Sequence, residues 1–389
     1  MLRVNRKAIL AAIALAGVLL AAAALTTQAA PQPHTGPSAA QPAAAQALAN
    51  AQCLACHATA SLNKELGDGT QLSLTVDEQT FDTSVHGAAG VGCTDCHSTI
   101  TKFPHPQFNA KDRRDVTLQL YTACRQCHDD KYQLTLDSMH QKALAGGNNN
   151  AAVCTDCHGA HDVQAITNPN TGNILAIARV KIPTTCARCH SAIYDQYRDS
   201  VHGSALIGQG NADVPTCIDC HGVHNIEDPT TAAFRLKSPN LCAKCHTDSA
   251  RMDPYGISTQ VLNTYVADFH GTTVTLFEKV TPDQQTNKPV CFDCHGIHNI
   301  SRVDDPQTGL QVKGNLLATC RKCHPDATAN FPDAWLSHYV PSADQNPLVF
   351  YVNLFYKYFI PAVIGGMLIF VLSDLYRRIR ESRKGATHS

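Results

Sequence analysis

The chain has 389 residues, of which 16% are charged, and its formal net charge at pH 7 is -1. This balance lacks the basic footprint of a nucleic-acid-binding protein, so no nucleic-acid partner is expected. The chain also contains 18 cysteines and 20 histidines, and their arrangement carries most of the functional information.

The first thirty residues have the pattern of a secretory signal. Three basic residues within the first seven precede an apolar run from Ala8 to Leu25, and small residues follow up to Ala30. We therefore predict a signal peptide over residues 1–30. The apolar run is long enough for an uncleaved membrane anchor, which is the alternative.

Residues 31–50 are rich in Ala, Pro and Gln and contain no charged residue. This composition predicts a flexible linker without a fold of its own. His34 lies in the linker, and we interpret it as solvent-exposed rather than as a ligand.

Residues 51–345 contain every cysteine of the chain, arranged in nine Cys-x-x-Cys-His motifs with no cysteine left over. The cysteines are Cys53, Cys56, Cys93, Cys96, Cys124, Cys127, Cys154, Cys157, Cys186, Cys189, Cys217, Cys220, Cys242, Cys245, Cys291, Cys294, Cys320 and Cys323. The histidines of the motifs are His57, His97, His128, His158, His190, His221, His246, His295 and His324. Two thiols at this spacing can add to the two vinyl groups of one haem, and the adjacent histidine then reaches its iron. The motifs predict nine covalently bound haem c groups.

Two other uses of cysteine are the minor alternatives. A single motif also fits half of a zinc site or a thioredoxin-like pair, but structural zinc needs four-ligand sets and does not explain a histidine after every pair. A disulfide framework is the other alternative. Successive motifs start only 25 to 49 residues apart. Because this is too little polypeptide for a conventional core around each haem, we expect the haem-free chain to be largely unfolded.

A two-haem unit recurs four times along this region. Each unit has an upstream histidine, a Cys-x-Asp-Cys-His motif, a nearby histidine and a second Cys-x-x-Cys-His motif. Units one to four begin at the upstream histidines His86, His140, His202 and His270. The motif that begins at Cys53 is a leading half-unit, and His338 belongs to a trailing one. The aspartates inside the first motifs are expected to cap the helices that start there, although they could also pair with a basic group.

The histidine count matches the motif count. Apart from the motif histidines, His34 and the penultimate His388, nine histidines remain. They are His86, His105, His140, His161, His202, His224, His270, His298 and His338. We predict that they are the distal ligands of nine six-coordinate, low-spin haems. His105 departs from the repeat pattern, because it is displaced and flanked by Pro104 and Pro106.

The spacing also suggests which haem some distal histidines serve. His161 is three residues beyond His158 and therefore cannot reach the opposite face of the same porphyrin. His140, His202 and His338 follow the preceding motif histidine by 12, 12 and 14 residues. That distance predicts that each folds back over the preceding haem.

The C-terminal region has the pattern of a membrane anchor. Residues 346–374 are apolar and aromatic, and residues 375–389 form a basic tail. This predicts a transmembrane helix whose tail is cytoplasmic, with the haem domain on the extracytoplasmic, periplasmic or outer, side of the cytoplasmic membrane. Lys357 could belong to a quinone site, but its place near the outer boundary favours snorkelling to the interface. The fold class is mostly α and irregular, with short helices and loops around stacked haems and little β structure.

These motifs resemble the multihaem c-type cytochrome family, in particular its membrane-anchored, bis-histidine electron-transfer members. The resemblance covers about residues 51–340 and rests on the nine motifs. It implies haems packed as a continuous wire, other redox proteins as partners, and a cytochrome b or another quinone-reactive membrane subunit beside the anchor. Haem-attachment machinery would be needed during maturation.

The expected function is outer-sphere transfer of single electrons between a quinol- or quinone-linked membrane partner and extracytoplasmic redox partners, because six-coordinate iron has no open position for a substrate. The competing hypothesis is a reductase of nitrite, hydroxylamine or a sulfur oxyanion with one open haem. Some nitrite reductases of this type carry a Cys-x-x-Cys-Lys motif, and the chain has none. A structural or filament-forming cytochrome is the third hypothesis.

Overall fold

The computed structural model describes residues 43–105, 107–334, 338–344 and 346–385. The signal-peptide prediction, His34 and His388 lie outside the described residues. All nine motifs and all nine predicted distal histidines lie within them.

The described chain is mostly helical, and the predicted fold class is confirmed. The α-helices are α2 (Ala43–His57), α3 (Glu78–Asp82), α4 (Val85–Ala88), α5 (Cys93–Cys96), α6 (Arg113–Leu120), α7 (Asp129–Leu136), α8 (Met139–Ala145), α9 (Cys154–His158), α10 (Ala176–Ala187), α11 (Ser191–Arg198), α12 (Val201–Gly203), α13 (Cys217–His221), α14 (Ala232–His246), α15 (Ser249–Met252), α16 (Val261–Ala267), α17 (Phe269–Val280), α18 (Cys291–His295), α19 (Lys313–Arg321) and α20 (Pro347–Gly385). The 3-10 turns are η1 (Tyr121–Gln126), η3 (Asp253–Tyr255) and η4 (Phe331–Ala334), and η2 (Ser204–Gly208) is a π-helical turn. The strands are β1 (Asn63–Glu65) and β2 (Gln71–Ser73), which form one antiparallel hairpin.

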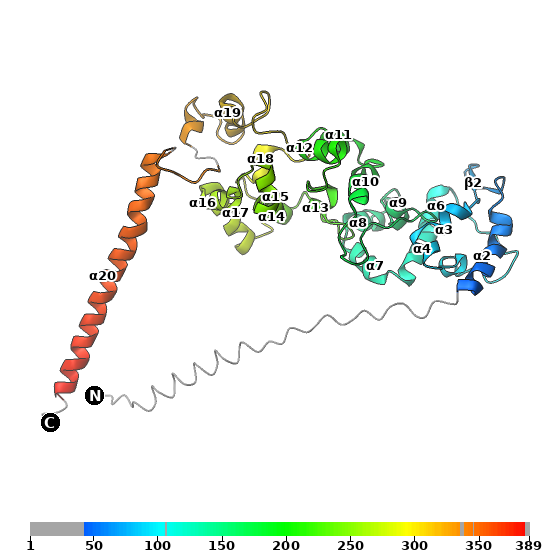
Figure 1. The fold of residues 1–389 in the computed structure, drawn as a ribbon, viewed down its shortest axis with the longest axis horizontal. Helices are drawn as coiled ribbons and strands as arrows, with labels where there is room; N and C mark the ends of the chain where they lie inside the picture. Colours follow the sequence, from blue (N-terminus) through cyan, green and yellow to red (C-terminus); the bar gives the residue numbers. More distant parts are fainter. Residues whose placement is uncertain (1–42, 106, 335–337, 345, 386–389) are drawn as a thin grey trace.

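The elements follow one another along the long axis of the molecule. Figure 1 shows α2 and β2 at one end and α19 at the other, where α20 departs from the rest of the chain. Helix α2 begins at Ala43, inside the segment predicted to be a linker. Alanine has the highest helix propensity, which explains why the Ala-rich end of that segment joins the helix of the first motif.

The aspartate of each Cys-x-Asp-Cys motif fixes the start of a short helix. The carboxylates of Asp95, Asp156, Asp219 and Asp293 accept a hydrogen bond from the backbone N–H three residues earlier, at 2.6 to 2.7 Å. A carboxylate in the first turn satisfies an N–H that has no partner inside the helix and also interacts favourably with the helix dipole. The predicted capping role is therefore confirmed.

The upstream histidines of the first three units sit at the second position of short helices that begin after a buried serine. The hydroxyls of Ser84, Ser138 and Ser200 accept hydrogen bonds from N–H groups three residues later, at 3.0 to 3.2 Å. In the units of Ser84 and Ser200 a glycine follows the histidine. A Cβ at Gly203 would lie 1.8 Å from the carbonyl oxygen of Tyr197, so only glycine fits this close approach.

The core formed by protein atoms alone is small. Its main described cluster consists of Leu236, Val274 and Val290, each 1% exposed, with Phe277 and Phe292 packed against it. These residues come from α14, α17, α18 and the residue before α18. A core of this size contributes little hydrophobic stabilisation for so long a chain, in line with the expectation that buried cofactor surface is needed.

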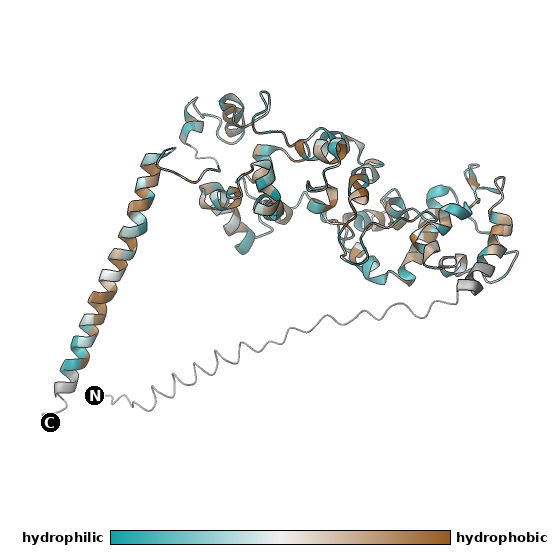
Figure 2. Ribbon diagram, viewed as in Figure 1, coloured by the Kyte–Doolittle hydropathy of each residue, from teal (hydrophilic) through white to brown (hydrophobic). Residues whose placement is uncertain are grey.

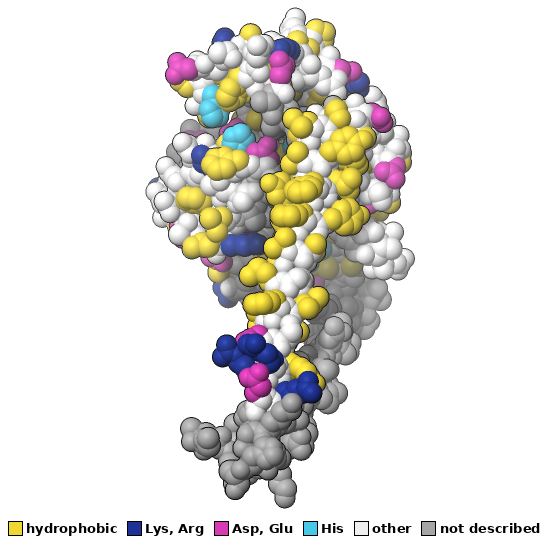
Figure 3. Space-filling view, turned by 90° about the vertical axis from the view of Figure 1, so that its left-hand side faces the viewer, with side chains coloured by type: hydrophobic (Ala, Val, Ile, Leu, Met, Phe, Trp, Pro, Cys, Tyr) yellow, Lys and Arg dark blue, Asp and Glu magenta, His cyan; other side chains and the backbone are white. Residues whose placement is uncertain are grey.

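Helix α20 is long and apolar enough to cross a membrane. The most apolar 18-residue window of its candidate span, Pro347–Glu381, has a mean hydropathy of 1.9, and none of that window is buried. Figure 2 shows α20 mainly brown in its middle and teal toward its C-terminal end. In Figure 3 hydrophobic side chains follow the helix, and basic side chains gather at its far end, where Arg377 and Arg378 pair with Asp374.

Candidate haem-ligand array

Every motif histidine faces one of the nine other histidines ring to ring. The centroids of the two rings are 6.0 to 6.3 Å apart in every pair. The pairs are His57–His105, His97–His161, His128–His86, His158–His224, His190–His140, His221–His298, His246–His202, His295–His338 and His324–His270. No described histidine of the two predicted sets is left out of this pairing.

The separation fits two imidazoles that bind one metal ion from opposite sides. With ring bonds of about 1.3 Å, a ring nitrogen lies about 1.1 Å from the centroid. Adding metal–nitrogen bonds of about 2.0 Å gives a centroid separation of about 6.2 Å. The angle between the ring planes varies from 7° to 55° while the separation stays constant. Rotation about a shared coordination axis allows this variation, whereas direct stacking of the rings would constrain the angle as well.

Other metal and sulfur chemistry fits less well. None of the eighteen cysteines, all in the described part of the chain, forms a disulfide. Among the same described residues there is no group of three or more His, Cys, Asp or Glu side chains that could hold a bare metal ion. Structural zinc would require such a group. The two-histidine pairs instead suit an iron whose other ligands come from a porphyrin.

The upstream histidine of each unit faces the second motif of the same unit. This holds for His86, His140, His202 and His270, which face the motif histidines 42 to 54 residues later. The prediction that His140 and His202 fold back over the preceding haem is therefore wrong. Helices α7 and α11 begin directly after His128 and His190. Each of these helices has eight residues and carries the chain about 12 Å away from the preceding motif. The upstream histidine that follows the helix therefore does not fold back over the preceding haem.

The nearby histidine of each later unit faces the first motif of the unit before it. His161 faces His97, His224 faces His158 and His298 faces His221. The expected inability of His161 to serve the haem of His158 is borne out by this arrangement. The trailing histidine follows the same rule, because His338 faces His295 rather than His324. Its predicted return to the preceding haem is also wrong.

Hydrogen bonds between units place the two kinds of histidine relative to each other. The residue before an upstream histidine donates its N–H to the carbonyl two residues after the nearby histidine of the next unit. The three bonds of this kind are Val85 to Val163 at 2.9 Å, Met139 to Ile226 at 2.8 Å and Val201 to Ile300 at 2.8 Å. Each unit is thus held to the next by backbone contacts as well as by the facing rings.

His105 is displaced because it faces a different kind of motif. The first motif, Cys53-Leu-Ala-Cys56-His57, lacks the internal aspartate and so resembles the second motif of a unit. No upstream histidine precedes it within the described residues, and His105 faces His57 with ring planes only 7° apart. In the other units a glycine with positive φ, such as Gly222 at +78°, turns the chain directly after the motif histidine. The nearby histidine then follows three residues after the motif histidine. Unit one has Ser98 there instead.

The cysteines show that consecutive motifs are spatial neighbours. The first cysteines of the first and second motifs are close enough to affect each other's pKa, and the same holds for the third and fourth, the fifth and sixth, and the seventh and eighth motifs. At the alternate junctions the second cysteine of one motif is within electrostatic range of both cysteines of the next. All eight junctions are therefore close, and the motifs follow their sequence order in space.

Burial favours the neutral imidazole at several of the paired histidines. Burial, with a smaller contribution from His246, lowers the pKa of His202 to about 4. Burial likewise lowers the pKa of His97, His158 and His295. Neutral imidazole is the form that binds a metal. The Nδ1 atom of His57 is 2.7 Å from the carbonyl oxygen of Leu74, just beyond β2, and donation from Nδ1 leaves Nε2 for coordination.

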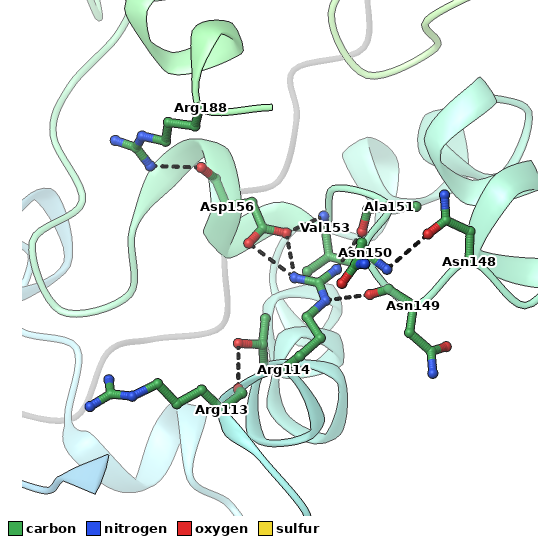
Figure 4. Close-up of polar contacts among 10 residues, drawn as sticks. Arg113, Arg114, Asn148, Asn149, Asn150, Ala151, Val153, Asp156 and Arg188 are labelled. Atoms are coloured by element: carbon green, nitrogen blue, oxygen red, sulfur yellow. Dashed lines mark hydrogen bonds and ion pairs between the residues drawn. The ribbon is translucent and has the colours of Figure 1, made fainter. Parts of the chain in front are cut away.

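Three arginines hold the junctions at which a second motif meets the first motif of the next unit. Arg114, Arg179 and Arg235 pair with Asp156, Asp219 and Asp293, with closest distances of 2.6 to 2.8 Å. Each guanidinium also donates to the carbonyl five residues before that aspartate. Figure 4 shows Arg114 reaching both Asp156 and the loop of residues 149–151. The aspartates therefore cap a helix and pair with a basic group at the same time.

The sequence reasoning did not identify these arginines. The sequence nevertheless contains a signal for two of them, because Arg179 and Arg235 both precede the first cysteine of a second motif by seven residues. Arg114 precedes Cys124 by ten. At the leading junction helix α2 contributes Asn50, three residues before the first motif, and its Oδ1 accepts the N–H of Cys93 at 2.9 Å.

Repeated Cys-x-x-Cys-His motifs and facing histidines in a mostly helical chain are features shared with multihaem c-type cytochromes. Residues 79–159 match the family described as cytochrome c7 and related cytochrome c, and this segment contains the motifs that begin at Cys93, Cys124 and Cys154. Members of that family are electron carriers with covalently bound haem c. No curated protein and no solved structure matches the chain.

Proposed function

We propose that the chain is a membrane-anchored, nine-haem electron carrier with bis-histidine ligation at every iron. The observation that carries this proposal is the set of nine facing histidine pairs with one common separation. Haem c would supply one-electron iron chemistry at each motif. The cysteines would hold it covalently, and the paired imidazoles would occupy both axial positions.

Axial ligands on both faces favour electron transfer over catalysis. An enzyme that reduces nitrite, hydroxylamine or a sulfur oxyanion needs an open position at one iron. His105 was the weakest of the predicted ligands, yet its ring lies 6.2 Å from that of His57, as in the regular pairs. The first motif is thus no better suited to an open site than the others.

The spatial order of the motifs supports a path along the length of the molecule. The first motif lies in α2 at one end, and the ninth lies at α19, near the start of α20 (Figure 1). The basic end of α20 points away from the motifs. By the positive-inside rule we propose that the haem domain is extracytoplasmic, that a cytochrome b or another quinone-reactive subunit meets the membrane end, and that other redox proteins meet the far end.

The test begins with the full-length chain produced together with haem-attachment machinery and purified from membranes in detergent. The intact mass should show nine covalently bound haems, and the electron paramagnetic resonance spectrum of the oxidised protein should contain only low-spin signals. A lower haem count, or a high-spin signal that shifts with cyanide or nitrite in the unaltered protein, would favour the catalytic alternative.

A single variant then tests the pairing. His202→Ala should convert one haem to a high-spin form, and peroxide oxidation at the opened iron should modify peptides around His246. Damage around His190 instead would contradict the structure. His388→Ala is the matched control, because that histidine belongs to neither ligand set, and it should leave all haems low-spin.

A further inference from the structure

The fourth unit differs from the other three at the residue that caps the helix of its upstream histidine. Units one to three have Ser84, Ser138 and Ser200 at this position, whereas unit four has Asp268. The Asp268 carboxylate accepts the N–H of His270 at 2.9 Å, so it performs the capping task that the serine hydroxyls perform elsewhere. It also places a negative charge at the capping position itself, where the other three units have a neutral hydroxyl; the nearest carboxylates of units two and three, Asp137 and Asp199, lie one residue further from the histidine.

This charge lies beside the ligand candidates of the last two motifs. The distance from Asp268 Oδ1 to His270 Nδ1 is 3.5 Å, and the aspartate side chain is 25% exposed. His270 faces His324 of the ninth motif. Asp268 is also an electrostatic neighbour of His338, which faces His295 of the eighth motif and whose Nδ1 is 3.4 Å from Thr264 Oγ1.

A fixed negative charge near an iron ligand favours the oxidised iron, which carries one more positive charge than the reduced iron. At a distance of about 8 Å and an effective dielectric constant of 20, one charge changes such an equilibrium about thirty-fold. Partial exposure and dissolved salt reduce the effect. Lys288 opposes it in part, since its ammonium lies over the ring of the adjacent Phe269, 4.8 Å from the centroid. We therefore expect the charge to change the redox equilibrium about tenfold, which corresponds to a shift of about 59 mV in the reduction potential of a one-electron couple.

We infer that Asp268 lowers the reduction potential of the ninth haem and, more weakly, of the eighth. This inference rests on the proposed nine-haem function. Electrons in the loaded chain would then be disfavoured at the end beside α20 and would reside preferentially toward the end formed by α2 and the hairpin. Asp268 acts through His270 and His338, so it is a positioning and tuning residue rather than a ligand.

The experiment compares Asp268→Ser with Asp268→Asn in the full-length, haem-loaded protein. The serine variant restores the cap of the other three units and removes only the charge. Potentiometric titration followed by optical and electron paramagnetic resonance spectra should show one component rising by about 59 mV and a second rising by less in both variants, with the remaining components unchanged. Asp283→Asn, which removes an exposed charge from the loop after α17, is the control and should shift no component.

The outcomes separate this inference from the function on which it rests. If both variants bind nine haems with unchanged potentials, Asp268 is only a helix cap and the inference is wrong. Serine and asparagine can both cap the helix, so if only one of the two variants shifts a potential, a local structural change rather than the lost charge is the cause, and the inference is again wrong. A haem count below nine in the unaltered protein would contradict the proposed function itself.

Discussion

Replacing Arg179 by alanine should destabilise the junction between the fifth and sixth motifs. The side chain is 13% exposed, and it makes short bonds to Asp219 at 2.6 Å and to the carbonyl of Val214 at 2.9 Å. Hydrogen bonds that involve a charged group contribute about 1.5–3 kcal/mol each. The buried Nε of Arg179 has no hydrogen-bond partner among the described residues, so its removal breaks no further hydrogen bond. Because Asp219 remains 33% exposed and can be rehydrated, we expect a net loss of about 2–3 kcal/mol.

Native-state hydrogen exchange read by mass spectrometry is the suitable assay, because repeat proteins open locally and a single unfolding midpoint would average over units. A loss of this size corresponds to amide exchange about 30- to 150-fold faster in peptides from α10 and α13. Arg198→Ala is the matched control. Its side chain is 47% exposed and pairs with Asp195 and Asp199, so its removal should cost less than about 1 kcal/mol. Equal exchange in the two variants would refute the reasoning.

Three further predictions concern the backbone, the first motif and the cofactor. Gly203→Ala should lower stability by about 1–3 kcal/mol in thermal unfolding, because its Cβ would clash with the Tyr197 carbonyl, whereas Gly208→Ala, with nothing within 4 Å, should not. His105→Ala should make one haem high-spin and open to cyanide, and an unchanged spectrum would contradict its pairing with His57. The full chain produced without haem attachment should show little helical signal in far-ultraviolet circular dichroism, and a native-like helical spectrum would show that the small core suffices.

The features that the sequence predicts well are those with local chemistry. A Cys-x-x-Cys-His motif contains both thiols and one ligand within five residues, and the aspartate inside four of the motifs meets a backbone N–H only three residues away. Counting histidines then singled out the nine histidines that face the motif histidines, without any knowledge of the path of the chain. The helical character followed from the same short segments.

The pairing of ligands was not predictable in this way, because it depends on where helices carry the chain. His202 is 12 residues from His190 but 44 from His246, and the nearer partner in sequence is excluded by the course of α11. The displacement of His105 breaks the repeat in the sequence, and its reason, the pairing with His57, is visible only in three dimensions. The bonds of Arg179 and Arg235 span 40 and 58 residues, so their function is visible only in three dimensions.

The two pairing rules govern how a chain of this kind can change in length. Each unit contributes two motifs and two further histidines, but one of those histidines faces a motif of the preceding unit. Inserting or deleting a whole unit inside the chain keeps every motif paired. Cutting the chain at a unit boundary instead leaves one motif without a partner histidine. A single histidine after the last unit, such as His338, supplies the partner that the first motif of that unit would otherwise lack. Under these rules a chain can be lengthened in steps of two motifs while the pairing at both of its ends stays the same.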